Sequence, residues 1–127
     1  MKIGYQFKPI DQGEMTHTKL VQYAGASGDF NPIHTVVPYA KEEAGLDDVI
    51  AHGMMIMGFM GRAITEWVDQ GKLKKFSTRF MKMTKPGEKI SVRGKIVDEM
   101  SEYWIGEVEA VNEMGEVKAK GIFEIEK

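Results

Sequence analysis

The sequence predicts an α+β domain in which a curved antiparallel sheet wraps around one long central helix. Residues 51–71 carry apolar side chains at helical spacing, and after Gly71 the pattern changes to alternation of apolar and polar residues. A chain of 127 residues suits one domain with a modest core. No repeat or linker divides it, so we expect a single domain over residues 1–127.

The part of the chain before the central helix is expected to combine short helices with irregular segments. Residues 3–15 carry scattered apolar side chains, which is typical of an irregular first strand. Residues 18–26 are predicted to form a helix with Thr16 or Thr18 as its cap, because three apolar residues share one face. Residues 38–44 begin with proline and precede a glycine, which predicts a second short helix.

The helix predicted at 51–71 has apolar residues on nearly every side of its first half, so we expect it to be buried all round. Gly58 and Gly61 each cost about 1 kcal/mol relative to alanine in a helix interior. Their presence predicts close approach of a neighbouring sheet or subunit. Four methionines of this helix are expected in the core, with part of them lining an acyl tunnel: Met54, Met55, Met57 and Met60.

Four strands are expected to follow the helix. They cover about residues 74–83, 89–96, 104–111 and 116–126. In each of the last three, alternate residues form one apolar face, as Ile90, Val92 and Ile96 do. Turn-forming residues separate the strands, which predicts consecutive antiparallel strands with one buried face.

The net charge of −2 gives no general attraction to nucleic acid, but residues 72–95 hold nine basic side chains and one acidic side chain. In the favoured interpretation this block is a polar strand face, where Arg93 and Lys95 pair with Glu107 and Glu109 of the next strand. The alternative is a landing site for an acyl carrier, either the phosphates of coenzyme A or an acidic carrier protein. The sequence shows no recognition helix of the kind that DNA-binding proteins use.

The chain contains no cysteine, which excludes disulfides, thiolate metal sites and a cysteine nucleophile. Its N-terminal stretch lacks the apolar core of a signal peptide, and no apolar run is long enough to span a membrane. We therefore expect a cytoplasmic protein without a membrane partner.

The stretch SGDFNPIH, residues 27–34, gathers an acid, an amide and an imidazole on one loop. Asp29 and His34 can act as a proton-transfer pair, and a positioned acid or base contributes about 10²–10⁴-fold to a rate. Pro32 stiffens the loop between them, and Asn31 can tie the loop to backbone groups. Without further context, an ordinary Asp-Asn turn beside a surface histidine would explain the same residues.

The wider motif resembles a known family. Tyr23, the stretch SGDFNPIH and Ala40 are similar to the signature of the MaoC-like hydratases and dehydratases, which include the (R)-specific enoyl-CoA hydratases. AHGM, residues 51–54, falls where that family has its second motif. Residues 51–68, from AHGM to the run TEWV, are also similar to part of the catalytic subunit of the mycobacterial-type (3R)-hydroxyacyl-ACP dehydratase.

The resemblance implies a hotdog fold and a homodimer or higher oligomer with the active site near the subunit interface. It implies reversible hydration of a trans-2-enoyl thioester of CoA or acyl carrier protein to the (R)-3-hydroxyacyl thioester. Asp29 and His34 would position and activate the water, and Gly53 would offer its N–H to the thioester oxygen. His52 is expected to shape the loop. No cofactor is implied, and three histidines without cysteine make a metal site the weaker interpretation.

The central helix departs from the family pattern at one point. The (R)-specific hydratases carry a serine there that supports the catalytic aspartate, whereas this helix has none. Gly61 stands in that place, and Thr65 is the only hydroxyl residue of the helix. Two other functions stay open for this architecture: a hotdog acyl thioesterase, and a subunit of a heterodimeric dehydratase. A non-catalytic partner subunit would be expected to lose Asp29 or His34, and this chain has both.

Overall fold

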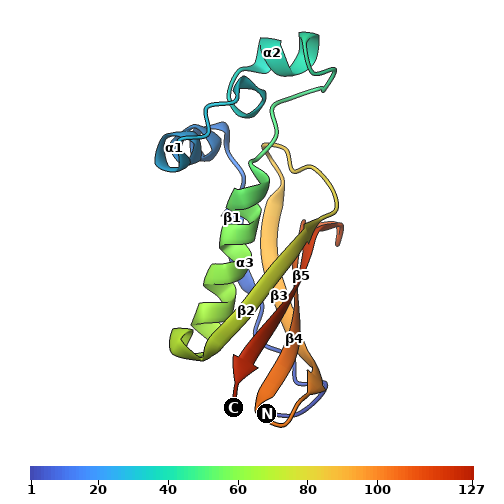
Figure 1. Cartoon of the computed structure of the whole chain (residues 1–127). Helices are drawn as coiled ribbons and strands as arrows, with labels where there is room; N and C mark the ends of the chain where they lie inside the picture. The colour runs from blue at the N-terminus through green and yellow to red at the C-terminus, as the bar shows by residue number, and fades with distance from the viewer.

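The computed structural model describes residues 1–127. Its elements in chain order are β1 (Ile10–Glu14), α1 (His17–Ser27), the 3-10 turn η1 (Pro32–His34), α2 (Val37–Glu42), α3 (Gly53–Trp67), the 3-10 turn η2 (Gln70–Lys72), β2 (Leu73–Phe80), β3 (Lys89–Glu99), β4 (Tyr103–Val111) and β5 (Val117–Glu126). The helical segment from α1 to α2 lies at one end of the molecule, and both chain termini lie at the other (Figure 1). No helix combines the length and apolar character that crossing a bilayer would require.

Capping residues define the helix that precedes the SGDFNPIH stretch. The side chain of Thr16 accepts a hydrogen bond from the Lys19 N–H, which confirms it as the cap of α1. The helix ends at Gly28, whose φ of 77° lies in the left-handed region that glycine tolerates best. The SGDFNPIH stretch therefore leaves the helix at a sharp angle.

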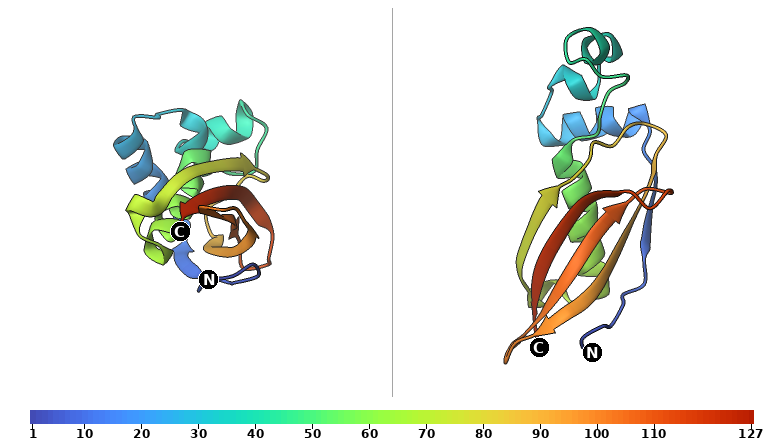
Figure 2. Two further views of the ribbon diagram at one scale, coloured as in Figure 1. Left: turned by 60° about the horizontal axis from the view of Figure 1, so that its bottom comes forward. Right: turned by 90° about the vertical axis from the view of Figure 1, so that its right-hand side faces the viewer.

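The five strands form one antiparallel sheet in the order β1-β3-β4-β5-β2, which curves around α3 (Figure 2). This confirms the predicted α+β class and the four strands after the helix. The strand that follows α3 does not pair with the next strand in sequence. Instead β2 lies beside β5, so that β1 and β2 are the two edges of the sheet.

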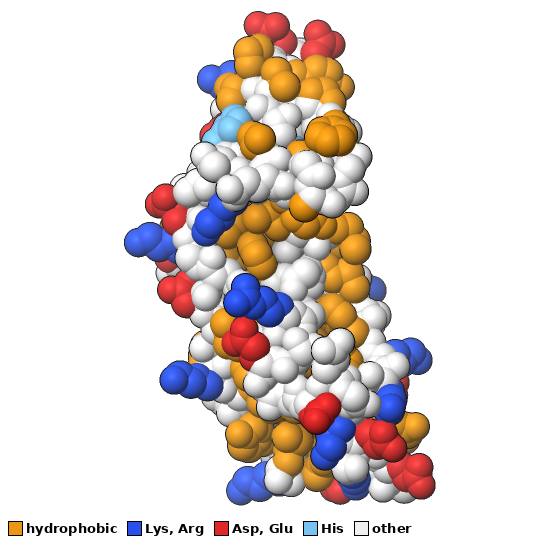
Figure 3. Space-filling model, turned by 90° about the vertical axis from the view of Figure 1, so that its left-hand side faces the viewer, with side chains coloured by type: hydrophobic (Ala, Val, Ile, Leu, Met, Phe, Trp, Pro, Cys, Tyr) orange, Lys and Arg blue, Asp and Glu red, His pale blue; other side chains and the backbone are white.

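The prediction that the central helix is buried all round is wrong for this chain. The sheet covers only one side of α3, which starts at Gly53 and ends at Trp67. On the other side, Met54 is 59% exposed, and a Cβ at Gly58 would meet no atom within 4 Å. Gly58 therefore makes no close approach within the chain. Hydrophobic side chains gather on the surface directly below the upper, helical part of the molecule (Figure 3).

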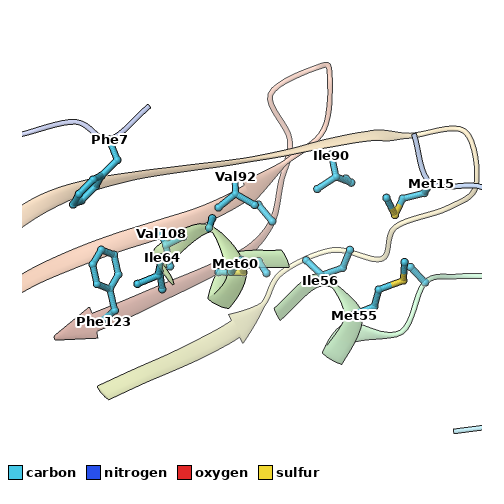
Figure 4. Packing of buried hydrophobic residues seen from close by; sticks show 14 of the residues in the cluster. Phe7, Met15, Met55, Ile56, Met60, Ile64, Ile90, Val92, Val108 and Phe123 are labelled. Carbon is cyan, nitrogen blue, oxygen red and sulfur yellow. The ribbon is translucent and has the colours of Figure 1, made fainter. Parts of the chain in front are cut away.

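The core lies between α3 and the concave face of the sheet. Ile56, Met60 and Ile64 of α3 point toward sheet residues such as Val92 and Val108 (Figure 4). The cluster contains 19 buried residues. Because α3 is anchored along this length, its first residue is held in a fixed place relative to the sheet.

Candidate active site

The SGDFNPIH loop is ordered by a chain of short side-chain bonds to the backbone. The Asp29 N–H donates to Ser27 Oγ at 3.1 Å, and the Asn31 N–H donates to Asp29 Oδ1 at 3.1 Å. Asn31 Oδ1 in turn accepts from the Ile33 N–H at 3.1 Å and caps η1, with proline in its first turn. In this geometry the Asn31 side chain ties the loop to the backbone, and Pro32 is the first residue of η1.

The loop brings Asp29 and His34 together. His34 Nε2 lies 3.9 Å from Asp29 Oδ2. On the other side of the ring, Nδ1 lies 2.7 Å from the carbonyl oxygen of Ile50. A carbonyl oxygen only accepts, so Nδ1 must carry a proton, and in the neutral ring Nε2 is then a free acceptor facing the carboxylate.

The separation of 3.9 Å is too long for a direct hydrogen bond, but a water molecule can bond to both groups across it. The Asp29 side chain is 53% exposed, so solvent has access to this position. An imidazole nitrogen and a carboxylate around one water form an arrangement that can remove and return a proton.

Gly53 is the first residue of α3, and its N–H has no acceptor among backbone or side-chain groups. It lines a cleft of about 340 Å³ together with His34. The ring of Phe80 would lie 3.3 Å from a Cβ at position 53, so a side chain would crowd this spot. A free N–H at a helix N-terminus is a fixed donor for an oxygen that gains negative charge.

The rest of the cleft is mostly apolar. Its remaining lining residues come from the segment before α3, from α3, from the end of β2 and the loop after it, and from β5: Ile50, Ala51, Ile56, Phe80, Met81, Lys82, Met83, Thr84 and Lys118. Such a lining suits an acyl chain that lies beside the polar groups of His34 and Gly53.

His52 contacts both members of the pair. Its ring stacks on the ring of His34, with centroids 3.8 Å apart and planes inclined by 23°. Its Nε2 donates to the carbonyl oxygen of Asp29 at 3.1 Å, and the side chain is almost completely buried. The expectation that His52 shapes the loop agrees with these contacts, but the stacking on His34 was not foreseen. Position 52 directly before Gly53 was the only signal in the sequence.

Lys118 was not among the expected site residues, because it falls on the polar face of the alternating pattern in residues 116–126. Only 4% of the residue is exposed, and it lines the same cleft as His34. Its ammonium group lies 2.7 Å from Glu88 and 3.2 Å from Glu116, and it donates to the carbonyl oxygen of Met83 at 3.0 Å. These partners compensate for the loss of solvent around the buried charge.

The carboxylates around Lys118 are held in their charged form. Partial burial raises the pKa of Glu88, but hydrogen bonds from Lys118, the Lys85 N–H and the Asn112 amide outweigh it and leave that pKa below its ordinary value. Hydrogen bonds from Lys82 and Lys118 likewise lower the pKa of Glu116. We call Lys118, Glu88, Glu116 and Asn112 the lysine cluster.

Ligand atoms of Asp29, His34 and His52 lie within 4.8 Å of one another, a spacing compatible with a metal ion. The two imidazoles are nearly parallel, and each donates to a backbone carbonyl. Lone pairs that lie in two stacked planes do not converge on one point, so this arrangement favours proton transfer over metal binding.

The favoured interpretation of the basic block agrees with the ion pairs. Arg93 pairs with Glu109 across β3 and β4 at 2.8 Å, as expected. Lys95 stands opposite Glu107 in the strand register without forming an ion pair. Three further lysines of the block are paired with acidic residues: Lys74, Lys82 and Lys85.

The helix α3 has no serine that could support Asp29, and the Thr65 hydroxyl does not donate a hydrogen bond to Asp29 either. The Thr65 hydroxyl donates within the helix to the carbonyl oxygen of Arg62 at 3.0 Å. Asp29 is held instead by the Asn31 N–H at its carboxylate and by His52 at its carbonyl.

Comparisons with known proteins identify relatives of this chain. The peroxisomal enoyl-CoA hydratase 2 of Arabidopsis thaliana is 40% identical over 65 residues, which cover 49% of this chain and 21% of that protein. The fatty acid synthase subunit beta of Aspergillus oryzae is 39% identical over 75 residues, covering 56% of this chain and 4% of that protein. The chain thus corresponds to a small part of these curated relatives.

Among solved structures, the unliganded R-hydratase PhaJ1 from Pseudomonas aeruginosa superimposes with a TM-score of 0.86 at 22% identity, covering 99% of this chain and 81% of that chain. This likeness confirms the hotdog fold. The sequence pattern of the family described as MaoC like domain matches residues 1–118. The chain therefore belongs to the MaoC-like domain family.

Proposed function

We propose that this chain catalyses the reversible hydration of trans-2-enoyl thioesters to (R)-3-hydroxyacyl thioesters. One observation carries the proposal: the free Nε2 of His34 lies 3.9 Å from the Asp29 carboxylate and beside a cleft that Gly53 also lines. Membership of the MaoC-like family and similarity to an enoyl-CoA hydratase support it.

In the hydration direction, a water held between Asp29 and His34 gives one proton to Nε2 of His34 while its oxygen bonds to C3 of the enoyl group. The electron pair of the C2–C3 double bond moves toward the carbonyl, and the thioester oxygen becomes an enolate. The Gly53 N–H donates to that oxygen, and one such donor typically contributes about 3 kcal/mol to transition-state stabilisation. The proton returns from the pair to C2, which restores both groups.

The carrier of the acyl group is proposed to be coenzyme A or an acyl carrier protein. Lys82 lines the cleft, but it is paired with Glu116 at 3.0 Å, so its charge is partly compensated. The Gly53 N–H would bind the thioester oxygen, which both carriers share. A substrate panel with both carriers distinguishes them.

We also propose that the chain acts as a dimer or larger oligomer. The edge strand β2 is eight residues long, whereas the other edge, β1, has five residues. Three large apolar side chains on or beside β2 are about half exposed: Phe80, Met81 and Ile122. An unpaired strand with exposed apolar residues favours pairing with another chain. Sedimentation should show an oligomer, and a fully active monomer would contradict this proposal.

The test of the activity uses the purified protein with crotonyl-CoA, with longer trans-2-enoyl-CoA esters and with the matching carrier-protein thioesters. We expect a 3-hydroxyacyl product of (R) configuration by chiral analysis. Release of free thiol without a hydroxyacyl product would instead identify a thioesterase. Absence of both products would overturn the proposal.

A further inference from the structure

His52 is a buried side chain that contacts both residues of the proposed acid–base pair. Its Nε2 donates to the carbonyl oxygen of Asp29, and its ring face covers the ring of His34. Only 2% of the residue is exposed. It also immediately precedes Gly53, so the same backbone segment carries the support and the proposed oxyanion donor.

The ring of His52 is fixed from three directions. The Tyr23 ring packs against it at an angle of 61°, with centroids 4.8 Å apart, and His34 stacks on it at 3.8 Å. Nδ1 is buried and has no hydrogen-bond partner, so the bond from Nε2 is the only hydrogen bond of this imidazole. The stack and this one bond together set the position of His52 relative to Asp29.

His34 needs this support because its own hydrogen bond leaves one motion free. The bond from Nδ1 to the Ile50 carbonyl fixes one atom of the ring, and the ring can still tilt about that bond. Stacking against a buried, nearly parallel ring opposes the tilt, which would move Nε2 away from Asp29. Asp29 itself receives no support from the Thr65 hydroxyl proton, which goes to the Arg62 carbonyl.

We infer that His52 is a positioning residue that holds Asp29 and His34 at the separation needed to share one water. The inference rests on the proposed function and assigns no proton transfer to His52 itself. Its two contacts are separable, since glutamine can keep the donor near the Nε2 position and phenylalanine can keep the ring face.

The experiment compares His52→Gln, His52→Phe and His52→Ala in the full chain, with steady-state hydration of an enoyl-CoA as the activity. Displacing a catalytic group by about 1 Å can cost on the order of 100-fold in rate, so we expect the alanine variant to lose about that factor in kcat while KM stays within about twofold. The glutamine and phenylalanine variants should each recover part of kcat. A loss confined to KM, or equal losses in all three variants, would overturn the inference.

His17→Gln is the matched control. His17 also bonds through Nε2 to a loop carbonyl, that of Thr35 at 2.9 Å, but it is exposed and stacks on neither site residue. Its kcat should stay within about twofold of the wild-type value. A loss as large as that of His52→Gln would show that general tethering of the loop, and not contact with the pair, explains the effect.

A second readout is independent of activity. Long-range ¹H–¹⁵N spectra report which ring nitrogen of each histidine carries the proton. We expect the wild type to show His34 protonated at Nδ1 with one sharp set of ring signals. His52→Gln and His52→Ala should keep this tautomer but show broadened or multiple His34 ring signals, because the ring can then tilt about its bond to Ile50. One sharp set of His34 ring signals in both of these variants would contradict positioning by His52. If the wild type hydrates no thioester, the proposed function fails, and these spectra decide the positioning claim separately.

Discussion

Two polar clusters border the same cleft, and they differ in how completely their groups are bonded. In the lysine cluster, the Lys118 ammonium has three partners, and Asn112 donates to both Glu88 and Glu116. In the cluster of Asp29, His34 and His52, the Nε2 of His34 and the Nδ1 of His52 lack a hydrogen-bond partner within 3.5 Å.

This difference separates structural from chemical roles. A fully bonded buried network stabilises the fold, because breaking any contact leaves a group without solvent or partner. An acceptor that is held in place but left free can take a proton from a ligand. The degree of bonding, more than the number of charged residues near the cleft, therefore identifies its reactive end.

The largest effect is expected from removing the free acceptor. His34→Ala or Asp29→Asn should lower kcat for enoyl thioester hydration by about 10²–10⁴-fold, since each removes one half of the proton-transfer pair. Thermal unfolding of Asp29→Asn should change little, because the Asp29 side chain is exposed. His34→Ala also loses the hydrogen bond to the Ile50 carbonyl and the stack on His52, so we expect it to unfold at a lower temperature while still folding. A variant with near-normal turnover would show that the free acceptor is not the reactive group.

The opposite behaviour is expected for the lysine cluster. Lys118→Met leaves Glu88 partly buried without its closest cation, so we expect a loss of about 1–3 kcal/mol in the free energy of unfolding, measured with urea. Lys120→Met is the matched control, because Lys120 lies on the same strand, is exposed and stands 3.7 Å from Glu109. Equal losses in the two variants would remove the distinction between the buried and the exposed ammonium.

The sequence predicted the parts of the fold that depend on local pattern. Alternation in residues 89–126 placed three strands and their buried faces, and the helix expected at residues 18–26 with Thr16 as a possible cap corresponds to α1. The pairing of β2 with β5 was not predictable in this way. It brings together strands almost 40 residues apart, and local periodicity carries no information about such partners.

The site shows the same limit. Asp29 and His34 belong to one short loop, so their proximity followed from the motif. The contacts of His52 depend on the segment before α3, where the Ala51 N–H bonds to the Thr84 carbonyl. Burial of Lys118 depends on Glu88, a residue on the loop before β3. Long-range packing decides both, so sequence spacing could not show them.

The pH dependence of stability should follow the lysine cluster. The pKa of Glu88 is lowered in the folded protein, so its contribution to stability is present above the pKa of an unfolded glutamate, about 4.3, and is lost as pH falls through the lower folded value. The free energy of unfolding of the wild type should therefore decrease as the pH is lowered below about 4.3. Glu88→Gln removes this group and should flatten the decrease. An unchanged slope in that variant would mean that other carboxylates, such as Glu116, account for the acid sensitivity.

The smallest effect is expected at the Arg93–Glu109 pair, which extends the comparison to the exposed surface of the sheet. Arg93→Gln should change the free energy of unfolding by less than about 1 kcal/mol, because the Arg93 side chain is more than half exposed and solvent screens its charge. Glu109 also retains Lys120 as a cationic neighbour at 3.7 Å. Urea unfolding at low and high ionic strength measures the difference, and added salt should reduce it further. If Arg93→Gln lowered the free energy of unfolding as much as Lys118→Met, an exposed ion pair would contribute as much to stability as the buried one in the cleft wall. Burial of the ammonium would then no longer explain why the lysine cluster is structural.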